Sequence, residues 1–343
     1  MSVFVIAEAG VNHNGDEKLA MELIKHAKCC GADAVKFQTF SAESLVCPGA
    51  KKAEYQEKSS DGDDQFSMLK KLEMSDELHS KLFNYCKDVG VEFMSTPFDK
   101  EALDFLIGLG MKRIKIPSGE ITNLPFIRYI SSKDLPMIMS TGMSTLAEIQ
   151  VAVDVIVQER IRCGFTDAID DVLTILHCTS NYPAKCEDVN LNAMITIKDT
   201  TNLPVGYSDH TLGTEVAIAS VAMGARVVEK HFTLDKKMSG PDHQASLSVE
   251  ELMAMITSIR NVENALGSFE KVPSATELPV RDVARRSICL IADVEEGAKI
   301  DESDLRCLRP GTGIPPSELT QVIGMSASRD LKANTCLQWT DVK

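Results

Sequence analysis

The chain has 343 residues, of which 44% are hydrophobic and 25% are charged, a composition that excludes wholesale disorder, collagen and fibrous repeats. Its formal net charge of −14, from 36 basic and 50 acidic residues, argues against nucleic acid or an anionic membrane surface as a partner. Because one barrel or doubly wound domain usually takes about 250 residues, we expect one large domain and a remainder of roughly 70–90 residues.

The first residues predict a strand from Val3 to Ala7 rather than a signal peptide, since they lack a basic start and a small-residue cleavage site. No run of about 18 apolar residues could cross a bilayer. The ten cysteines are scattered and include no CxxC pair, which favours reduced thiols over a disulfide framework or a zinc ribbon. We therefore expect a cytoplasmic protein.

Eight short apolar runs alternate with amphipathic stretches between residues 3 and 265, and each run is typical of a buried strand. Such alternation predicts parallel strands joined by right-handed crossovers. Eight units indicate a (β/α)8 TIM barrel, because a doubly wound sheet more often has five or six strands. The predicted strands are Val3–Ala9, Ala34–Phe40, Glu92–Pro97, Arg113–Ser118, Pro136–Thr141, Val172–Thr179, Pro204–His210 and Arg226–Thr233.

Two segments interrupt this pattern. The connection over residues 41–75 is much longer than the others, which is typical of a lid or a binding loop, with disorder as the alternative. Residues 267–282 contain Pro273 and Pro279 and predict a linker. We therefore expect a TIM barrel over residues 1–266 and a small second domain over residues 283–343.

Polar residues collect where the predicted strands end. In a TIM barrel this rim holds the active site, so the convergence predicts an enzyme. The residues concerned are Glu8, Lys36, Gln38, Ser95, Thr96, Lys115, Ser118, Glu120, Ser140, Thr141, Thr179, Ser180, Tyr182, Ser208, Asp209, His210, Glu229 and His231.

Two lysines within these strands indicate an anionic substrate. Together with nearby hydroxyls, Lys36 and Lys115 could cradle a phosphate group without a P-loop. The alternative is that they form structural ion pairs with Glu8 and Glu120. The hydroxyls expected in the cradle are those of Thr96, Ser118, Ser140 and Ser208.

Two histidines at the ends of adjacent strands, His210 and His231, could bind a divalent metal and leave positions open for water and substrate. The alternative is that each is a hydrogen-bonded core residue. Glu8 and Glu120 are candidate acid/base carboxylates. Elsewhere we expect His26 and His79 to be solvated on helix faces, and the stem of Lys230 to extend toward solvent past its apolar strand neighbours.

Several motifs taken together resemble those of the sialic acid (nonulosonic acid) synthases, in the order of that family and over essentially the whole chain. The carboxyl-terminal stretch Leu308–Gly313 is similar to their antifreeze-like (SAF) domain. The motifs are Ala7–Gly15, Val35–Thr39, Ser95–Phe98, Lys115–Glu120, Ser140–Met143, Tyr207–His210, Glu229–Phe232 and Gly240–His243.

The resemblance implies condensation of phosphoenolpyruvate with an N-acylated hexosamine to give a nine-carbon 2-keto sugar acid and phosphate. It also implies a metal, Mn²⁺ or Mg²⁺, on His210 and His231, and catalytic roles for Glu8, Lys115 and Glu120. Lys36, Thr96, Lys115, Ser118, Ser140 and Ser208 would bind phosphoenolpyruvate. The implied sugar contacts are Glu8, Gln38, Ser180, Tyr182, Asp242 and Arg309.

The resemblance further implies a domain-swapped homodimer, in which the SAF domain of one protomer completes the rim of the other and supplies Arg309. For the sugar we expect N-acetylmannosamine, giving N-acetylneuraminate. The alternative is 2,4-diacetamido-2,4,6-trideoxymannose, giving N,N′-diacetyllegionaminate, because residues 51–56 and 240–247 resemble both kinds of synthase. Ser180 stands where some bacterial neuraminate synthases have an Asn that contacts the sugar, so the resemblance leaves the acyl-sugar pocket open.

Two other functions were weighed. A condensing barrel that acts on a phosphorylated sugar would need a further basic cluster, and the sequence shows none. A non-catalytic carbohydrate- or ice-binding protein would leave Lys36, Lys115 and the paired histidines unexplained.

Overall fold

The computed structural model describes residues 2–47, 50 and 64–343, and these form two compact units, Met1–Gly267 and Ser268–Lys343. Each unit has its own hydrophobic core. No helix among the described residues has the length and apolar character required of a membrane span. Residues 48–49 and 51–63 of the long connection lie outside the described part of the chain. Its described remainder forms two short helices, α2 (Ala42–Leu45) and α4 (Gln65–Lys70).

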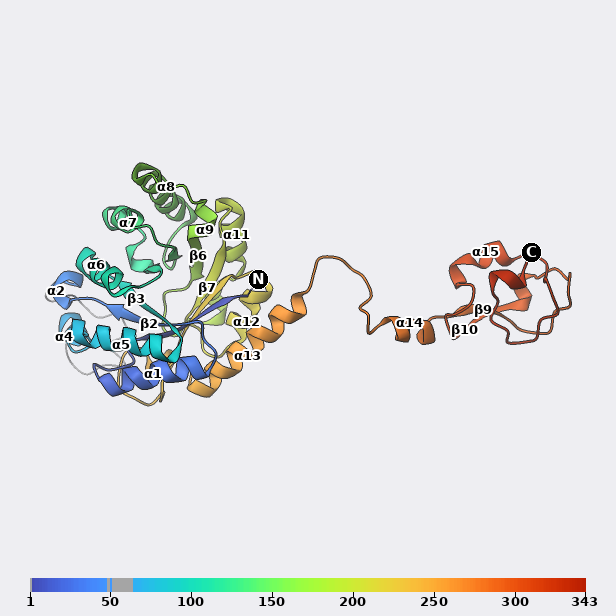
Figure 1. The fold of residues 1–343 in the computed structure, drawn as a ribbon, viewed down its shortest axis with the longest axis horizontal. Coiled ribbons are helices and arrows are strands. Elements are labelled where there is room, and N and C mark those ends of the chain that lie inside the picture. The colour runs from blue at the N-terminus through green and yellow to red at the C-terminus, as the bar shows by residue number, and fades with distance from the viewer. Residues whose placement is uncertain (1, 48–49, 51–63) are drawn as a thin grey trace. The chain divides into compact units, whose positions relative to one another are not determined.

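The first unit is a (β/α)8 barrel, as the alternation predicted. All its strand pairs are parallel, in the order β3-β2-β1-β8-β7-β6-β5-β4 (Figure 1). The strands are β1 (Phe4–Gly10), β2 (Ala34–Thr39), β3 (Glu92–Pro97), β4 (Ile114–Ile116), β5 (Met137–Ser140), β6 (Leu173–Cys178), β7 (Val205–Asp209) and β8 (Val227–His231).

Helices surround the strands, and their ends follow local sequence signals. For example, α8 begins at a capping box in which Thr145 and Glu148 satisfy each other's backbone, and it ends at Gly164 with φ +82°. The longer helices are α1 (Glu17–Cys29), α5 (Asp76–Val89), α6 (Lys100–Leu109), α7 (Leu124–Ser131), α8 (Leu146–Cys163), α11 (Asn192–Thr201), α12 (Glu215–Ala222) and α13 (Val249–Leu266). The shorter ones are α9 (Ile169–Val172), α10 (Cys186–Val189), η1 (Ser118–Glu120) and η2 (His243–Ala245).

The interior of the barrel is layered. One layer is apolar and closes the barrel: Ile6, Ala34, Met94, Ile138, Leu176 and Val227. Side chains two residues apart on a strand share a face, so the next layer toward the carboxyl ends faces the same interior. It consists of Glu8, Lys36, Thr96, Ser140, Cys178 and Glu229. An apolar floor therefore supports a layer of buried polar and charged groups.

The second unit is small and mostly irregular. Its antiparallel strands β9 (Ser287–Leu290) and β10 (Leu305–Leu308) pack with a core that includes Ile300, Ile314 and Leu337. Arg309 directly follows β10 and is exposed. The other elements are α14 (Leu278–Ala284), α15 (Leu319–Val322), η3 (Glu302–Asp304), η4 (Pro316–Glu318) and η5 (Trp339–Asp341).

The expectation that His79 is solvated was wrong. His79 is 1% exposed and lies against the strand ends. Its Nδ1–H donates to the carbonyl of Ser75, and its Nε2 lies 2.8 Å from the hydroxyl of Thr39. These partners satisfy both ring nitrogens, and burial lowers the pKa of the imidazole, so His79 is buried in its neutral form.

Candidate active site

A buried network of charges lies directly above the apolar floor. The ammonium of Lys36 lies 2.5 Å from Glu8 Oε2 and 3.6 Å from Glu229 Oε2, and it donates to Thr96 Oγ1 at 3.1 Å. Burial disfavours the charge of Lys36, but Glu229 and Glu8 outweigh this and raise the pKa of Lys36 above its ordinary value. Lys36 is therefore a permanent buried cation.

Glu229 joins the two lysines. Its Oε1 lies 3.6 Å from the ammonium of Lys115 and accepts a hydrogen bond from Ser208 at 3.0 Å. Burial opposes its ionisation, yet Lys115 and Lys36 lower the pKa of Glu229 to about 2. For Glu8 burial prevails, and its pKa rises to about 7. Glu229 is thus ionised at neutral pH, whereas Glu8 lies near the midpoint of its titration.

The structural alternative for the two lysines is only half correct. Lys36 pairs with Glu8 as that alternative expected, whereas Lys115 pairs with Glu229 and not with Glu120. Strand β4 ends at Ile116, and the following turn η1 carries Glu120 to a position where it accepts from Asn123. A pocket of about 570 Å³ opens above this charge network, and Glu120, predicted as an acid/base group, is not among its lining residues.

Hydroxyl and amide groups complete the surroundings of Lys115. Its ammonium donates to Ser140 at 2.7 Å, while the hydroxyl of Ser118 accepts from the backbone N–H of Gly142 at 3.0 Å. All the residues predicted for the phosphate cradle line this pocket. They are Lys36, Thr96, Lys115, Ser118, Ser140 and Ser208.

The two predicted metal ligands lie on the wall of the same pocket. The rings of His210 and His231 have centroids 5.5 Å apart. His210 Nδ1–H donates to the carbonyl of Thr179 at 2.7 Å, which leaves Nε2 as the nitrogen with a free lone pair. His231 Nδ1 is buried without a hydrogen bond in the described structure, 3.7 Å from Asp242 Oδ2.

This donor set fits a catalytic rather than a structural metal site. Each imidazole keeps one uncommitted nitrogen, and Asp242 lies beside them as a hard oxygen donor. Within residues 2–47, 50 and 64–343 there is no preformed group of three His, Cys, Asp or Glu ligands. A divalent ion here would therefore rely on water and substrate for its remaining positions.

Of the residues predicted to contact a sugar, five line this pocket and one, Arg309, belongs to the second unit. The five are Glu8, Gln38, Ser180, Tyr182 and Asp242. The ring of Tyr182 lies 4.0 Å from that of His210, and Gln38 donates to Glu8 at 3.5 Å. Ser180 and Asp242 line the same pocket, and burial raises the pKa of Asp242 to about 6. Arg309 belongs to the second unit, so the structure leaves its predicted sugar contact untested.

Two loops hold Asp242 in place. His243 Nε2–H donates to Asn14 Oδ1 at 3.2 Å, and Asn14 in turn donates to the carbonyl of Ser239 at 3.0 Å. Gly240 has φ +151°, and a Cβ there would lie 2.6 Å from the His243 ring. The loop can approach Asn14 this closely only because position 240 has no side chain.

A second ion pair lies behind the histidines, on the outer face of the barrel strands. Lys230 and Asp209 are register partners on β8 and β7, fully buried, with Nζ and Oδ2 2.8 Å apart. Lys230 also donates to the carbonyl of Thr211. The expectation that Lys230 extends to solvent was therefore wrong, because Asp209 neutralises it in place. The pair joins the strand ends that carry His210 and His231.

Comparisons with known proteins identify the chain in two parts. The model of the NeuB family matches residues 23–271, and that of the SAF domain matches residues 285–343. The N,N′-diacetyllegionaminic acid synthase of Legionella pneumophila is 53% identical, over 100% of this chain and 95% of the relative. The N,N′-diacetyllegionaminic acid synthase of Campylobacter jejuni is 44% identical, over 97% of this chain and 98% of the relative.

A solved structure agrees with these matches. The N-acetylneuraminic acid (sialic acid) synthetase of Leptospira borgpetersenii, crystallised with citrate, superposes with a TM-score of 0.70. It is 31% identical in sequence, with 82% of this chain and 90% of that chain covered.

The buried pair behind the histidines leads to a stability prediction. Lys230→Met leaves the carboxylate of Asp209 buried without its cation, and we expect the free energy of unfolding to fall by about 3–5 kcal/mol. Urea denaturation measures the loss. Adding Asp209→Asn should recover part of it, because the second change removes the unpaired charge. The control is Lys236→Met, which breaks a partly exposed pair with Glu251. Equal effects of Lys230→Met and Lys236→Met would contradict the account.

Proposed function

Since the chain belongs to the NeuB family and ends in a SAF domain, we propose that it is an N,N′-diacetyllegionaminate synthase. Membership of the family makes it an enzyme of the sialic acid (nonulosonic acid) synthase type, as its motifs indicated. From the motifs alone we expected N-acetylmannosamine as the sugar. The relatives at 53% and 44% identity favour the alternative, 2,4-diacetamido-2,4,6-trideoxymannose.

The charge network supports phosphoenolpyruvate as the other substrate. Lys36 offers a buried cation, Lys115 a buried amine whose pKa is lowered by burial and would be raised by a bound anion, and the hydroxyls of Ser118, Ser140 and Ser208 offer directional donors. Because the two amines are buried, they would interact more strongly with a phosphate or a carboxylate than groups in water do. The observation that carries the proposal is that Lys36 and Lys115 both lie in the charge network above the apolar floor, where Glu229 pairs with each of them.

In the proposed reaction, the methylene carbon of phosphoenolpyruvate bonds to the aldehyde carbon of the open-chain sugar. Water then adds to C2, and the C–O bond to phosphate breaks, giving the 2-keto sugar acid and phosphate. Lys36 and Lys115 hold the phosphate, and the charge on Lys36 persists as it departs. The acid/base role falls to Glu8, which lies in the pocket, rather than to Glu120, which lies outside it.

We further propose Mn²⁺ or Mg²⁺ as the cofactor, held by His210 and His231. When bound, the ion would polarise the sugar aldehyde as a Lewis acid. The carbonyl of Thr179 fixes the ring of His210 so that Nε2 remains available. Tyr182 packs over both imidazoles and limits access of water to them.

The role of the second unit is also a proposal. In a homodimer with exchanged SAF domains, each barrel would receive an Arg309 that contacts the sugar. The support is the separate core of this unit, which allows it to act as a body of its own, and the exposure of Arg309. The cytoplasmic location expected from the reduced cysteines remains part of this proposal.

Phosphate release tests the function directly. The protein is incubated with Mn²⁺, phosphoenolpyruvate and either 2,4-diacetamido-2,4,6-trideoxymannose or N-acetylmannosamine. We expect release with both sugars, and kcat/KM about tenfold or more higher with the diacetamido sugar, because a lost polar contact costs at least this much. No release with either sugar would refute the synthase, and a preference for N-acetylmannosamine would refute the proposed substrate.

The metal proposal predicts that His231→Ala loses bound Mn²⁺ and turnover together. Equilibrium dialysis with elemental analysis measures the metal independently of activity. The matched control is His26→Ala, since His26 lies on α1 beside Glu22, away from the pocket. If His231→Ala retained one tightly bound Mn²⁺ per chain, the assignment of the ligands would be wrong.

A further inference from the structure

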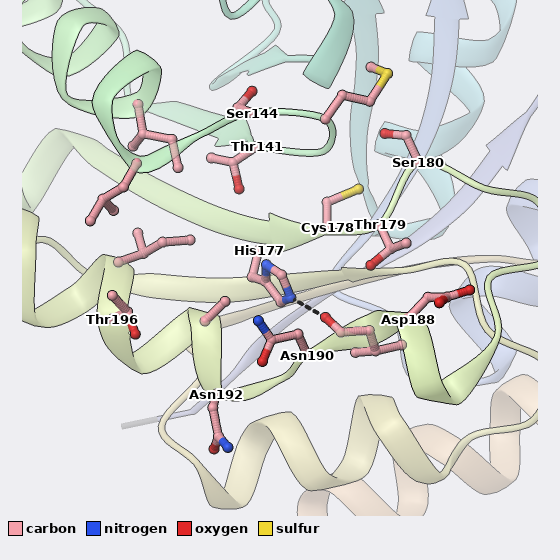
Figure 2. A pocket seen from close by; sticks show the side chains of 16 residues that line it. Thr141, Ser144, His177, Cys178, Thr179, Ser180, Asp188, Asn190, Asn192 and Thr196 are labelled. Carbon is pink, nitrogen blue, oxygen red and sulfur yellow. Dashed lines mark hydrogen bonds between the residues drawn. The ribbon is translucent and has the colours of Figure 1, made fainter.

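A second cavity, of about 650 Å³, lies outside the ring of strands (Figure 2). Its floor is the outer face of β6 at His177, and its sides are the start of α8 and the segment from α10 into α11. The volume falls within the range of small-molecule sites. We refer to it as the side cavity, and nothing in the reaction described above uses it.

The lining of the side cavity suits a neutral amide with a methyl group. No lysine or arginine is among its described lining residues, so a phosphate or carboxylate would find no countercharge. Asn190, Asn192 and Thr196 offer neutral donors and acceptors, and Ile149 and Ile197 offer apolar surface. The lining also includes the exposed Asp188, whose carboxylate can accept from an amide N–H. The Nε2–H of His177 already donates to the carbonyl of Val189, which leaves Nδ1 as an acceptor.

The side cavity and the catalytic pocket share a wall. Met143, Cys178 and Ser180 line both. Thr179, which also lines the side cavity, accepts the hydrogen bond from His210. Gly142 has no Cβ, and this leaves room for the hydroxyl of Ser180 beside it. The two cavities therefore adjoin at these residues, next to the imidazole proposed to hold the aldehyde end of the sugar.

We propose that the side cavity receives the acylamino group at C4 of the sugar, and thereby selects a diacylated over a monoacylated substrate. The inference rests on the proposed function, because N-acetylmannosamine carries a hydroxyl at C4 and would leave the cavity empty. With the aldehyde at His210 and His231, the C4 substituent would enter the side cavity past Met143, Cys178 and Ser180, the residues that line both.

The test fills the cavity from α11. Ala193 lines it, and Ala193→Leu adds three carbons to that surface at no cost in helix propensity beyond a few tenths of a kcal/mol. The matched control is Lys198→Leu, which changes an exposed position of the same helix that does not line the cavity. For each protein, kcat/KM for each sugar is measured with Mn²⁺ and phosphoenolpyruvate present, and the dissociation constant of each sugar is measured with Mn²⁺ in the absence of phosphoenolpyruvate.

We expect Ala193→Leu to lower the ratio of kcat/KM for the diacetamido sugar to that for N-acetylmannosamine about tenfold or more, and Lys198→Leu to leave it unchanged. An unchanged ratio in Ala193→Leu overturns the inference while the proposed function stands. A wild-type protein that does not prefer the diacetamido sugar contradicts the proposed function instead. If Ala193→Leu does not fold, Thr196→Leu fills the same cavity from an exposed position and carries the same test.

Discussion

The carboxylate of Glu229, held between the ammonium groups of Lys36 and Lys115, is the interaction on which the rest of the site depends. Two like charges buried near each other would repel, and each would lose its hydration. For Lys36, Glu229 and Glu8 outweigh these costs, whereas for Lys115 burial outweighs the attraction of Glu229 and lowers the pKa of its ammonium below the ordinary value. The barrel can thus keep two lysines in its interior despite an overall excess of acidic residues.

Strand β8 shows how a short sequence builds this arrangement. Val227 belongs to the apolar floor, Glu229 to the charged layer and His231 to the proposed metal site, each two residues above the last. Lys230 points to the opposite face, where Asp209 of β7 neutralises it. The alternation of side chains along β8 therefore fixes how far above the apolar floor each part of the site lies. The ion pair on the outer face joins the end of β8 to the end of β7.

The position of each polar residue on its strand was predictable, because strand ends can be located from apolar runs. This is why Lys36, Lys115, His210 and His231 were found without the structure. Partners across strands were not predictable. Glu229 was recognisable as a strand-end residue, but its place between two lysines depends on how β2, β4 and β8 converge. Glu120 lies outside the pocket lining because the chain leaves β4 in a tight turn that no apolar pattern records.

The wrong expectations about buried side chains have a similar cause. The periodicity of α5 shows which residues lie on its surface, but not that Thr39 on a distant strand provides a partner for His79. The choice between sugars depends on the shape of the rim, which strand patterns do not determine. In contrast, the fold and the two-domain organisation rest on repeated local signals, and those signals agree over the whole chain.

The site depends most on Lys36 and Lys115 binding the anionic groups of phosphoenolpyruvate, with the bound anion favouring the charged form of the buried Lys115. Calorimetric titration of phosphoenolpyruvate into the Mn²⁺-loaded protein tests it, with Lys115→Met compared with Lys112→Met, an exposed lysine just before the same strand. The account predicts a dissociation constant about tenfold to hundredfold weaker for Lys115→Met, as expected for a lost charged hydrogen bond, and no change for Lys112→Met. Equal affinity in a folded Lys115→Met protein would contradict it.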